Sequence, residues 1–138
     1  MTTETQPTLP CAARLWLFIG ALNALFSVAA GAYGRHGALD PAGREMFAIA
    51  VQYQMVHALA LLAVAWLASR CDGCRLITIP NVAGAAFTLG ILLFSGSLFW
   101  FGLYGLVPVE GAAPAGGFLM MAGWLALMWQ AIRPRPAR

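Results

Sequence analysis

Charged side chains are scarce in this sequence: Asp, Glu, Lys and Arg together make up 9% of its 138 residues. Soluble domains average about 25% charged residues, and so small a share cannot cover the surface of a water-soluble fold of this length. Hydrophobic residues make up 61%. The composition therefore excludes an ordinary soluble domain and predicts a protein that lies in a lipid bilayer, where an apolar surface is stable.

Acidic residues are absent from the long apolar runs, since Asp40, Glu45, Asp72 and Glu110 all fall in or beside expected connections. The carboxylate relay that is common in ion-coupled transporters is therefore missing. Neither a Ser-His-Asp arrangement nor the zinc motif H-E-x-x-H can be assembled from this sequence. We expect a protein that is not an enzyme, with no catalytic and no metal-binding residues.

Lysine is also absent, so every basic side chain is an arginine. If the apolar runs alternate across the bilayer, only Arg35 and Arg44 fall on one side. The other side holds Arg14, Arg70, Arg75, Arg133, Arg135 and Arg138. The positive-inside rule places this richer side in the cytoplasm, which predicts that both termini are cytoplasmic. Arginines that hold the helix ends on the cytoplasmic side explain the net charge of +3. We therefore expect no nucleic-acid partner.

What the sequence does contain is a set of charge-free runs, each long enough for a span of about 20 apolar residues. They cover residues 15–34, 46–69, 76–109 and 111–132. Pro80 and the turn at 105–108 shorten the third run to one span. The sequence therefore predicts an all-α fold, a four-helix transmembrane bundle, with the lipid bilayer as its main partner.

The expected organisation is a single transmembrane domain at 14–132. Its helices are predicted at 14–34, 41–68, 80–104 and 114–132. A short polar segment at 1–13 would precede this domain, and a basic tail at 133–138 would follow it, both in the cytoplasm.

Polar side chains inside the apolar runs are few, and His57 is the most informative of them. It lies near the middle of the second span, in the stretch VQYQMVHALALL. Polar groups at that depth are costly and usually face protein or a water-filled cavity. Gln54 and Tyr53, three and four residues earlier, are neighbours of His57 on a helix surface.

Depth matching indicates which residues could contact this histidine. Asn23 lies near the centre of the first span, and two serines lie near the centre of the third. The expected intramembrane polar cluster comprises Asn23, Tyr53, Gln54, His57, Ser95 and Ser97. It could be a hydrogen-bonded clasp that locks the bundle, a proton- or ligand-handling site, or a contact with a partner protein.

Gln52 needs a separate explanation. It lies two residues from Gln54, hence about 200° around the helix, so the two side chains cannot face the same neighbour. The second span is therefore either enclosed on several sides or presents a polar group to another chain. We identify Gln52 as a possible partner contact.

No cofactor is indicated. A haem in a membrane takes axial ligands from facing helices at matched depth, whereas His36 lies in the first outer loop and His57 lies near mid-membrane. Cys71 and Cys74 form a C-x-x-C in the inner connection, but zinc normally requires four ligands. We interpret this segment as a tight turn, and a redox or metal role stays open.

Four longer motifs follow one another along the chain: GAYGRHGAL, AVQYQMVHALALL, LGILLFSGSLFWFGLYG and APAGGFLMMAGW. In this order and spacing they resemble the domain-of-unknown-function 423 family of small bacterial membrane proteins. The resemblance covers nearly the whole chain beyond Leu15. Arg35 stands where the family pattern has a small residue, and Ala113 where it has a threonine before the proline.

The resemblance implies a four-helix inner-membrane protein and brings no established activity with it. The matching positions are Gly34, His36 and Gly37 in the outer loop, then Gln52, Tyr53, Gln54, His57, Ser95, Gly96, Ser97, Pro114, Gly116 and Gly117. They overlap the expected polar cluster, and no catalytic role is attached to any of them.

Our leading hypothesis is a non-enzymatic accessory protein that packs against a larger membrane complex or against copies of itself. It is based on the missing catalytic set, the missing soluble domain and the two glutamines that face apart. The competing hypothesis is a small transporter or channel-like protein with a mid-membrane polar site around His57. A third possibility is a contribution of His57 and Tyr53 to an enzyme or quinone site completed by another chain.

Overall fold

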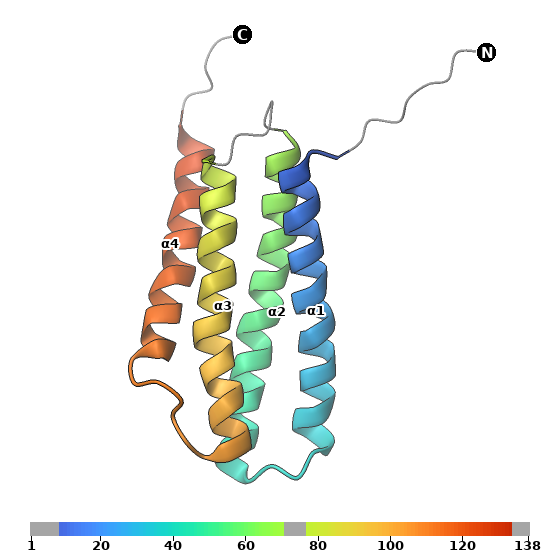
Figure 1. Cartoon of the computed structure of the whole chain (residues 1–138), viewed down its shortest axis with the longest axis vertical. Helices are drawn as coiled ribbons and strands as arrows, with labels where there is room; N and C mark the ends of the chain where they lie inside the picture. Colours follow the sequence, from blue (N-terminus) through green and yellow to red (C-terminus); the bar gives the residue numbers. More distant parts are fainter. Residues whose placement is uncertain (1–8, 71–76, 134–138) are drawn as a thin grey trace, which may run out of the picture.

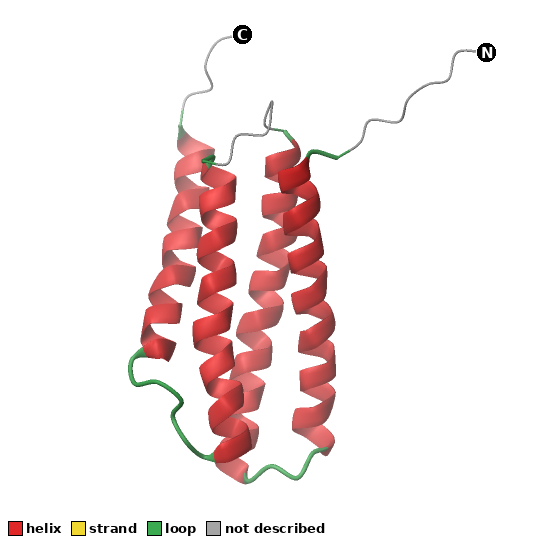
Figure 2. Cartoon of the chain, in the orientation of Figure 1, coloured by secondary structure: helices red, strands yellow, loops and turns green. Residues whose placement is uncertain are grey.

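The computed structural model describes residues 9–70 and 77–133. Within these residues the chain forms four helices and no strand (Figures 1 and 2): α1 (Cys11–His36), α2 (Pro41–Ser69), α3 (Ile79–Tyr104) and α4 (Ala112–Ile132). Each helix is long and apolar enough to cross a membrane. The all-α transmembrane fold expected from the sequence is thereby confirmed, whereas the expected sidedness stays a prediction.

The helix boundaries have local causes. Asp40 Oδ1 accepts a hydrogen bond of 2.6 Å from the Gly43 N–H and so caps the start of α2, and Pro41 suits the first turn. Thr78 caps α3 in the same way through the Asn81 N–H. α3 ends where Gly105 takes up φ +67°, a left-handed conformation that glycine adopts without strain.

The helices lie side by side in chain order. α1 packs on α2, α2 on α3 and α3 on α4, and α1 touches α3 only slightly. α1 and α4 lie at opposite edges of this arrangement, and the first turn of α1 lies at the same end as the last turn of α4 (Figure 1). The two central helices are therefore the most buried, while each helix keeps one face that no other described residue covers.

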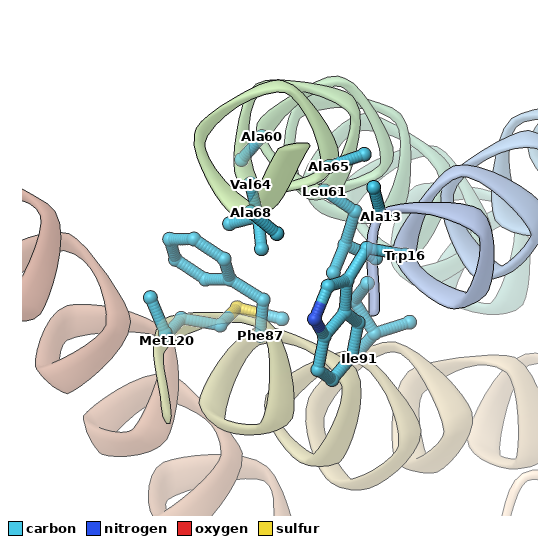
Figure 3. Close-up of a cluster of buried hydrophobic side chains, with 11 residues drawn as sticks. Ala13, Trp16, Ala60, Leu61, Val64, Ala65, Ala68, Phe87, Ile91 and Met120 are labelled. Carbon is cyan, nitrogen blue, oxygen red and sulfur yellow. The ribbon is translucent and has the colours of Figure 1, made fainter. Parts of the chain in front are cut away.

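The core lies where all four helices contribute side chains. Figure 3 shows Phe87 and Ile91 of α3 directed toward α2, with Trp16 entering from α1 and Met120 from α4. Phe87 is fully buried. Because lipid provides no hydrophobic drive between helices, such packing contributes through close van der Waals contact.

Glycines set the closest approaches between helices. At the α3–α4 contact, a Cβ atom on Gly116 would lie 2.5 Å from the backbone nitrogen of Phe94 and 2.8 Å from the Gly90 carbonyl oxygen. At the α2–α3 contact, a Cβ on Gly43 would lie 2.6 Å from the Gly102 carbonyl oxygen. Only a residue without a side chain fits these positions, since backbone atoms cannot rotate away.

Candidate functional site

His57 is held by hydrogen bonds at both ring nitrogens. Its Nδ1 lies 2.7 Å from the Tyr53 carbonyl oxygen, one turn earlier on α2. Its Nε2 lies 3.2 Å from Nε1 of Trp124 on α4. An indole N–H can only donate, so Nε2 must accept, and the proton of a neutral ring must sit on Nδ1 and be donated to the carbonyl. The histidine is thus a neutral link between α2 and α4.

Aromatic rings enclose this histidine. The His57 ring centroid lies 5.4 Å from Phe87 and 6.0 Å from Trp124, and those two rings meet edge to face at 5.2 Å. The Tyr53 ring stacks toward His57 and packs against Phe94 at 4.7 Å. His57 is only 5% exposed, so its ring joins α2, α3 and α4 and is shielded from solvent.

Asn23 and Gln54 form a second polar contact, between α1 and α2. Gln54 Nε2 donates to Asn23 Oδ1 at 2.9 Å, and Asn23 Nδ2 donates to the Ile19 carbonyl oxygen at 2.9 Å. Gln54 Oε1 and the hydroxyl of Ser27 are buried here and have no hydrogen-bond partner among the described residues. This contact fastens α1 to α2 but leaves part of its hydrogen-bonding capacity unused.

The two serines of α3 act separately. Ser95 Oγ donates to the Ala50 carbonyl oxygen at 3.1 Å and so joins α3 to α2. Ser97 Oγ donates to the Leu93 carbonyl oxygen of its own helix at 2.6 Å. Both are buried, and both hydroxyls are bonded to backbone carbonyl groups. Neither is placed by these bonds against His57 or Asn23.

The structure thus divides the expected polar cluster into separate contacts. It brings Gln54 to Asn23 of α1 and His57 to Trp124 of α4. The reason is the helical period: residues three apart differ by about 60° in direction, enough to turn Gln54 toward α1 and His57 toward α4. These residues lie at a similar depth in the membrane, but similar depth does not bring their side chains into contact.

Gln52 lies on the exposed face of α2, which also carries Val56 and Leu59. It is three residues from the midpoint of α2, about 4.5 Å along the axis, and therefore within the hydrocarbon region of a bilayer. No hydrogen bond joins its amide to the described residues. Gln52 is thus an exposed intramembrane amide to which no described residue is hydrogen-bonded.

The expected outer-loop motif forms the end of α1. Gly34 is buried against Phe47 of α2, while His36 is exposed as the last residue of the helix. The Gly37 N–H donates to the Tyr33 carbonyl oxygen at 2.6 Å and closes the final turn. A Cβ at Gly37 would lie 2.6 Å from that same oxygen. The motif is a compact helix stop, remote from His57 in the chain.

Metal-binding groups are not assembled in the part of the chain that the structure describes: no three His, Cys, Asp or Glu residues there could hold one ion. Cys11 is a free, exposed thiol. Cys71 and Cys74 lie outside the described residues, as do most of the polar segment at 1–13 and of the basic tail at 133–138.

Two tryptophan contacts were not anticipated from the sequence. Trp124 contacts His57, and Trp16 of α1 donates from Nε1 to Asn81 Oδ1 of α3 at 2.8 Å. The Trp124–His57 contact could have been predicted from depth, because Trp124 lies near the middle of α4 as His57 does in α2. An indole N–H is a hydrogen-bond donor inside a membrane, so a search for donors at the depth of His57 would have included Trp124.

This fold and these contacts define a class: a small multi-pass membrane protein whose buried polar groups hold its own helices together. The chain belongs to the family described as "Protein of unknown function (DUF423)", which matches residues 30–117. The family resemblance drawn from the four sequence motifs is thereby confirmed.

Known relatives are membrane proteins by name. The chain is 36% identical over 118 residues to a UPF0382 membrane protein of Staphylococcus epidermidis, covering 83% of this chain and 93% of the relative. It is 32% identical over 123 residues to the UPF0382 membrane protein YwdK of Bacillus subtilis, covering 87% and 98%. A UPF0382 membrane protein of Haemophilus influenzae is 31% identical over 123 residues. No solved structure matches this chain.

Proposed function

We propose that this protein is a non-enzymatic accessory subunit of the bacterial inner membrane that packs laterally against another membrane protein chain. The contact is made by the exposed face of α2. Both termini lie in the cytoplasm. Among the described arginines, Arg14, Arg70 and Arg133 lie at one end of the bundle and only Arg35 and Arg44 at the other, and this distribution supports that orientation.

The observation that carries the proposal is the exposure of the Gln52 amide, in contrast to three intramembrane polar residues that are hydrogen-bonded within the chain. Asn23, His57 and Ser95 all use their side chains in bonds within the chain, whereas the Gln52 amide faces outward. An amide placed in hydrocarbon without a hydrogen-bond partner costs roughly 4–8 kcal/mol on transfer scales. A partner chain that supplies a donor and an acceptor at this depth removes that cost.

The geometry of His57 supports a structural role in preference to a transport pivot. A proton-handling histidine needs a nitrogen that can exchange its proton with water or with a neighbouring acid. Here one nitrogen donates to the Tyr53 carbonyl and the other accepts from Trp124. The ring therefore fastens α2 to α4 and has no free position for a transported proton or ligand.

Native mass spectrometry of the protein, extracted gently at its natural abundance, tests this function. We expect the wild-type chain to retain at least one further protein chain, and Gln52→Leu to lose it because the shared hydrogen bonds are gone. Leu25→Ala is the matched control, since Leu25 is 69% exposed near the middle of α1; it should retain the partner. Equal retention by the wild type and Gln52→Leu would remove Gln52 from this role.

A further inference from the structure

The exposed face of α2 follows a repeat of 3.5 residues. Its positions alternate at spacings of three and four along two-thirds of the helix. We name this stripe the α2 seam, and its members are Ile49, Gln52, Val56, Leu59, Ala63 and Trp66. All but the half-buried Ile49 are exposed. The spacing is that of the contact line in a left-handed helix pair, which crosses at about +20°.

The α2 seam lies on the side of α2 that faces away from the helices packed against it. Leu61, which is fully buried, lies about 180° around α2 from Gln52, and buried Gln54 about 200° around. α1 and α3 pack on that buried half of α2. The opposite half can therefore accept another helix along its whole length without displacing a helix of this chain.

Gln52 is the one polar residue of the seam. A single polar residue in an otherwise apolar heptad line fixes the register and the number of helices that associate. In a membrane, such a residue also supplies the hydrogen bond that drives helices together. The identity of the partner can therefore be inferred from the chemistry of this amide.

We propose that the α2 seam binds the α2 seam of a second copy of this chain. Two copies inserted in the same direction have parallel α2 helices, and a two-fold axis along the membrane normal places both Gln52 residues at the same depth. A carboxamide carries both a donor and an acceptor, so each Gln52 donates to the other. A two-fold interface is self-complementary in this manner, and both amides are satisfied.

An unrelated partner would have to supply its own polar group at this depth, opposite an apolar line of matching shape. A second copy supplies both by symmetry. The inference rests on the proposed function, in which the exposed face of α2 contacts another protein chain, and it names that chain.

Cysteine cross-linking in native membranes tests the second copy. The natural Cys11, Cys71 and Cys74 are replaced by serine, and single cysteines are introduced as Val56→Cys, Leu59→Cys or Ala63→Cys, which leave Gln52 in place. Leu25→Cys on α1 and Leu92→Cys on α3 are the controls, because both positions are well exposed at similar depth. Oxidation should give disulfide-linked dimers at the seam positions and monomers at the controls.

Dimer dissociation gives an independent measurement. Gln52→Leu should raise the dimer dissociation constant about tenfold, which corresponds to about 1.4 kcal/mol. Gln52→Asn keeps a carboxamide and should restore part of the affinity. If the seam positions cross-link no more than positions 25 and 92, the proposal that the α2 seam binds a second copy is wrong. In that case, native mass spectrometry of the gently extracted protein separates the two proposals. If the wild-type chain retains a different protein chain that Gln52→Leu releases, the proposed function stands. If the wild-type chain retains no other chain, both the proposed function and the second copy are wrong.

Discussion

Replacing Gly116 by alanine is expected to destabilise the bundle by about 1–3 kcal/mol, the usual range for overpacking. The added Cβ would lie 2.5 Å from the Phe94 backbone nitrogen and 2.8 Å from the Gly90 carbonyl oxygen. Since both are backbone atoms, α4 can accept the methyl group only by moving away from α3. The free energy of unfolding in mixed detergent, followed by circular dichroism, measures the loss.

The neighbouring glycine is a matched control for this substitution. A Cβ on Gly117 meets only Phe94 Cδ2, at 4.0 Å, an ordinary van der Waals contact. Gly117→Ala adds the same methyl group to the same turn of α4 and should leave the unfolding free energy unchanged or raise it by up to about 1 kcal/mol, because alanine is the better helix former. Equal effects of the two substitutions would show that the α3–α4 contact does not depend on this close approach.

His57→Leu is expected to destabilise the bundle by about 1–3 kcal/mol, because it leaves the buried indole N–H of Trp124 without an acceptor. Trp124→Phe removes the donor instead and leaves His57 Nε2 without one. The double variant should be less destabilised than the sum of the two single variants, since neither polar group remains unpaired. Unfolding free energies of the four proteins give the interaction energy directly.

The same His57 variant separates a structural clasp from a transport pivot. A clasp predicts a loss of stability, and His57→Leu protein that is folded in liposomes should show the same proton and solute flux as the wild type. A wild-type flux that His57→Leu abolishes, together with an unchanged unfolding free energy, would contradict the clasp and favour the transport hypothesis.

The fold was accessible from the sequence because the bilayer constrains it so strongly. Charge-free runs of sufficient length, interrupted at Pro80 and at Gly105, predict the spans directly. The boundaries shifted where local chemistry allowed a longer helix. α1 starts at Cys11 and not at Arg14, because a long arginine side chain can extend from a helix toward water. α4 starts at Ala112 and includes Pro114, since proline is tolerated in a first turn.

The polar contacts could be predicted only in part from the sequence. The period of α2 showed that Gln52 and Gln54 must face apart, and the structure places Gln54 against α1 and Gln52 outside the bundle. Hydropathy determines the depth of each residue but not which helices are neighbours around the bundle. Depth alone therefore could not decide that His57 meets Trp124 of α4 and that Asn23 meets Gln54, which lies three residues from His57 on α2.

Photo-cross-linking in living cells tests most directly that the exposed face of α2 contacts protein. A photoreactive amino acid is placed at position 59 of α2, which is 57% exposed and lies on the same face as Gln52, so that Gln52 itself stays in place. In a parallel strain it is placed at position 92, where Leu92 of α3 is 64% exposed. The account predicts that illumination joins position 59 to a polypeptide chain, while position 92 is joined to lipid alone. Lipid adducts alone at both positions would contradict it, because the exposed face of α2 would then face the bilayer.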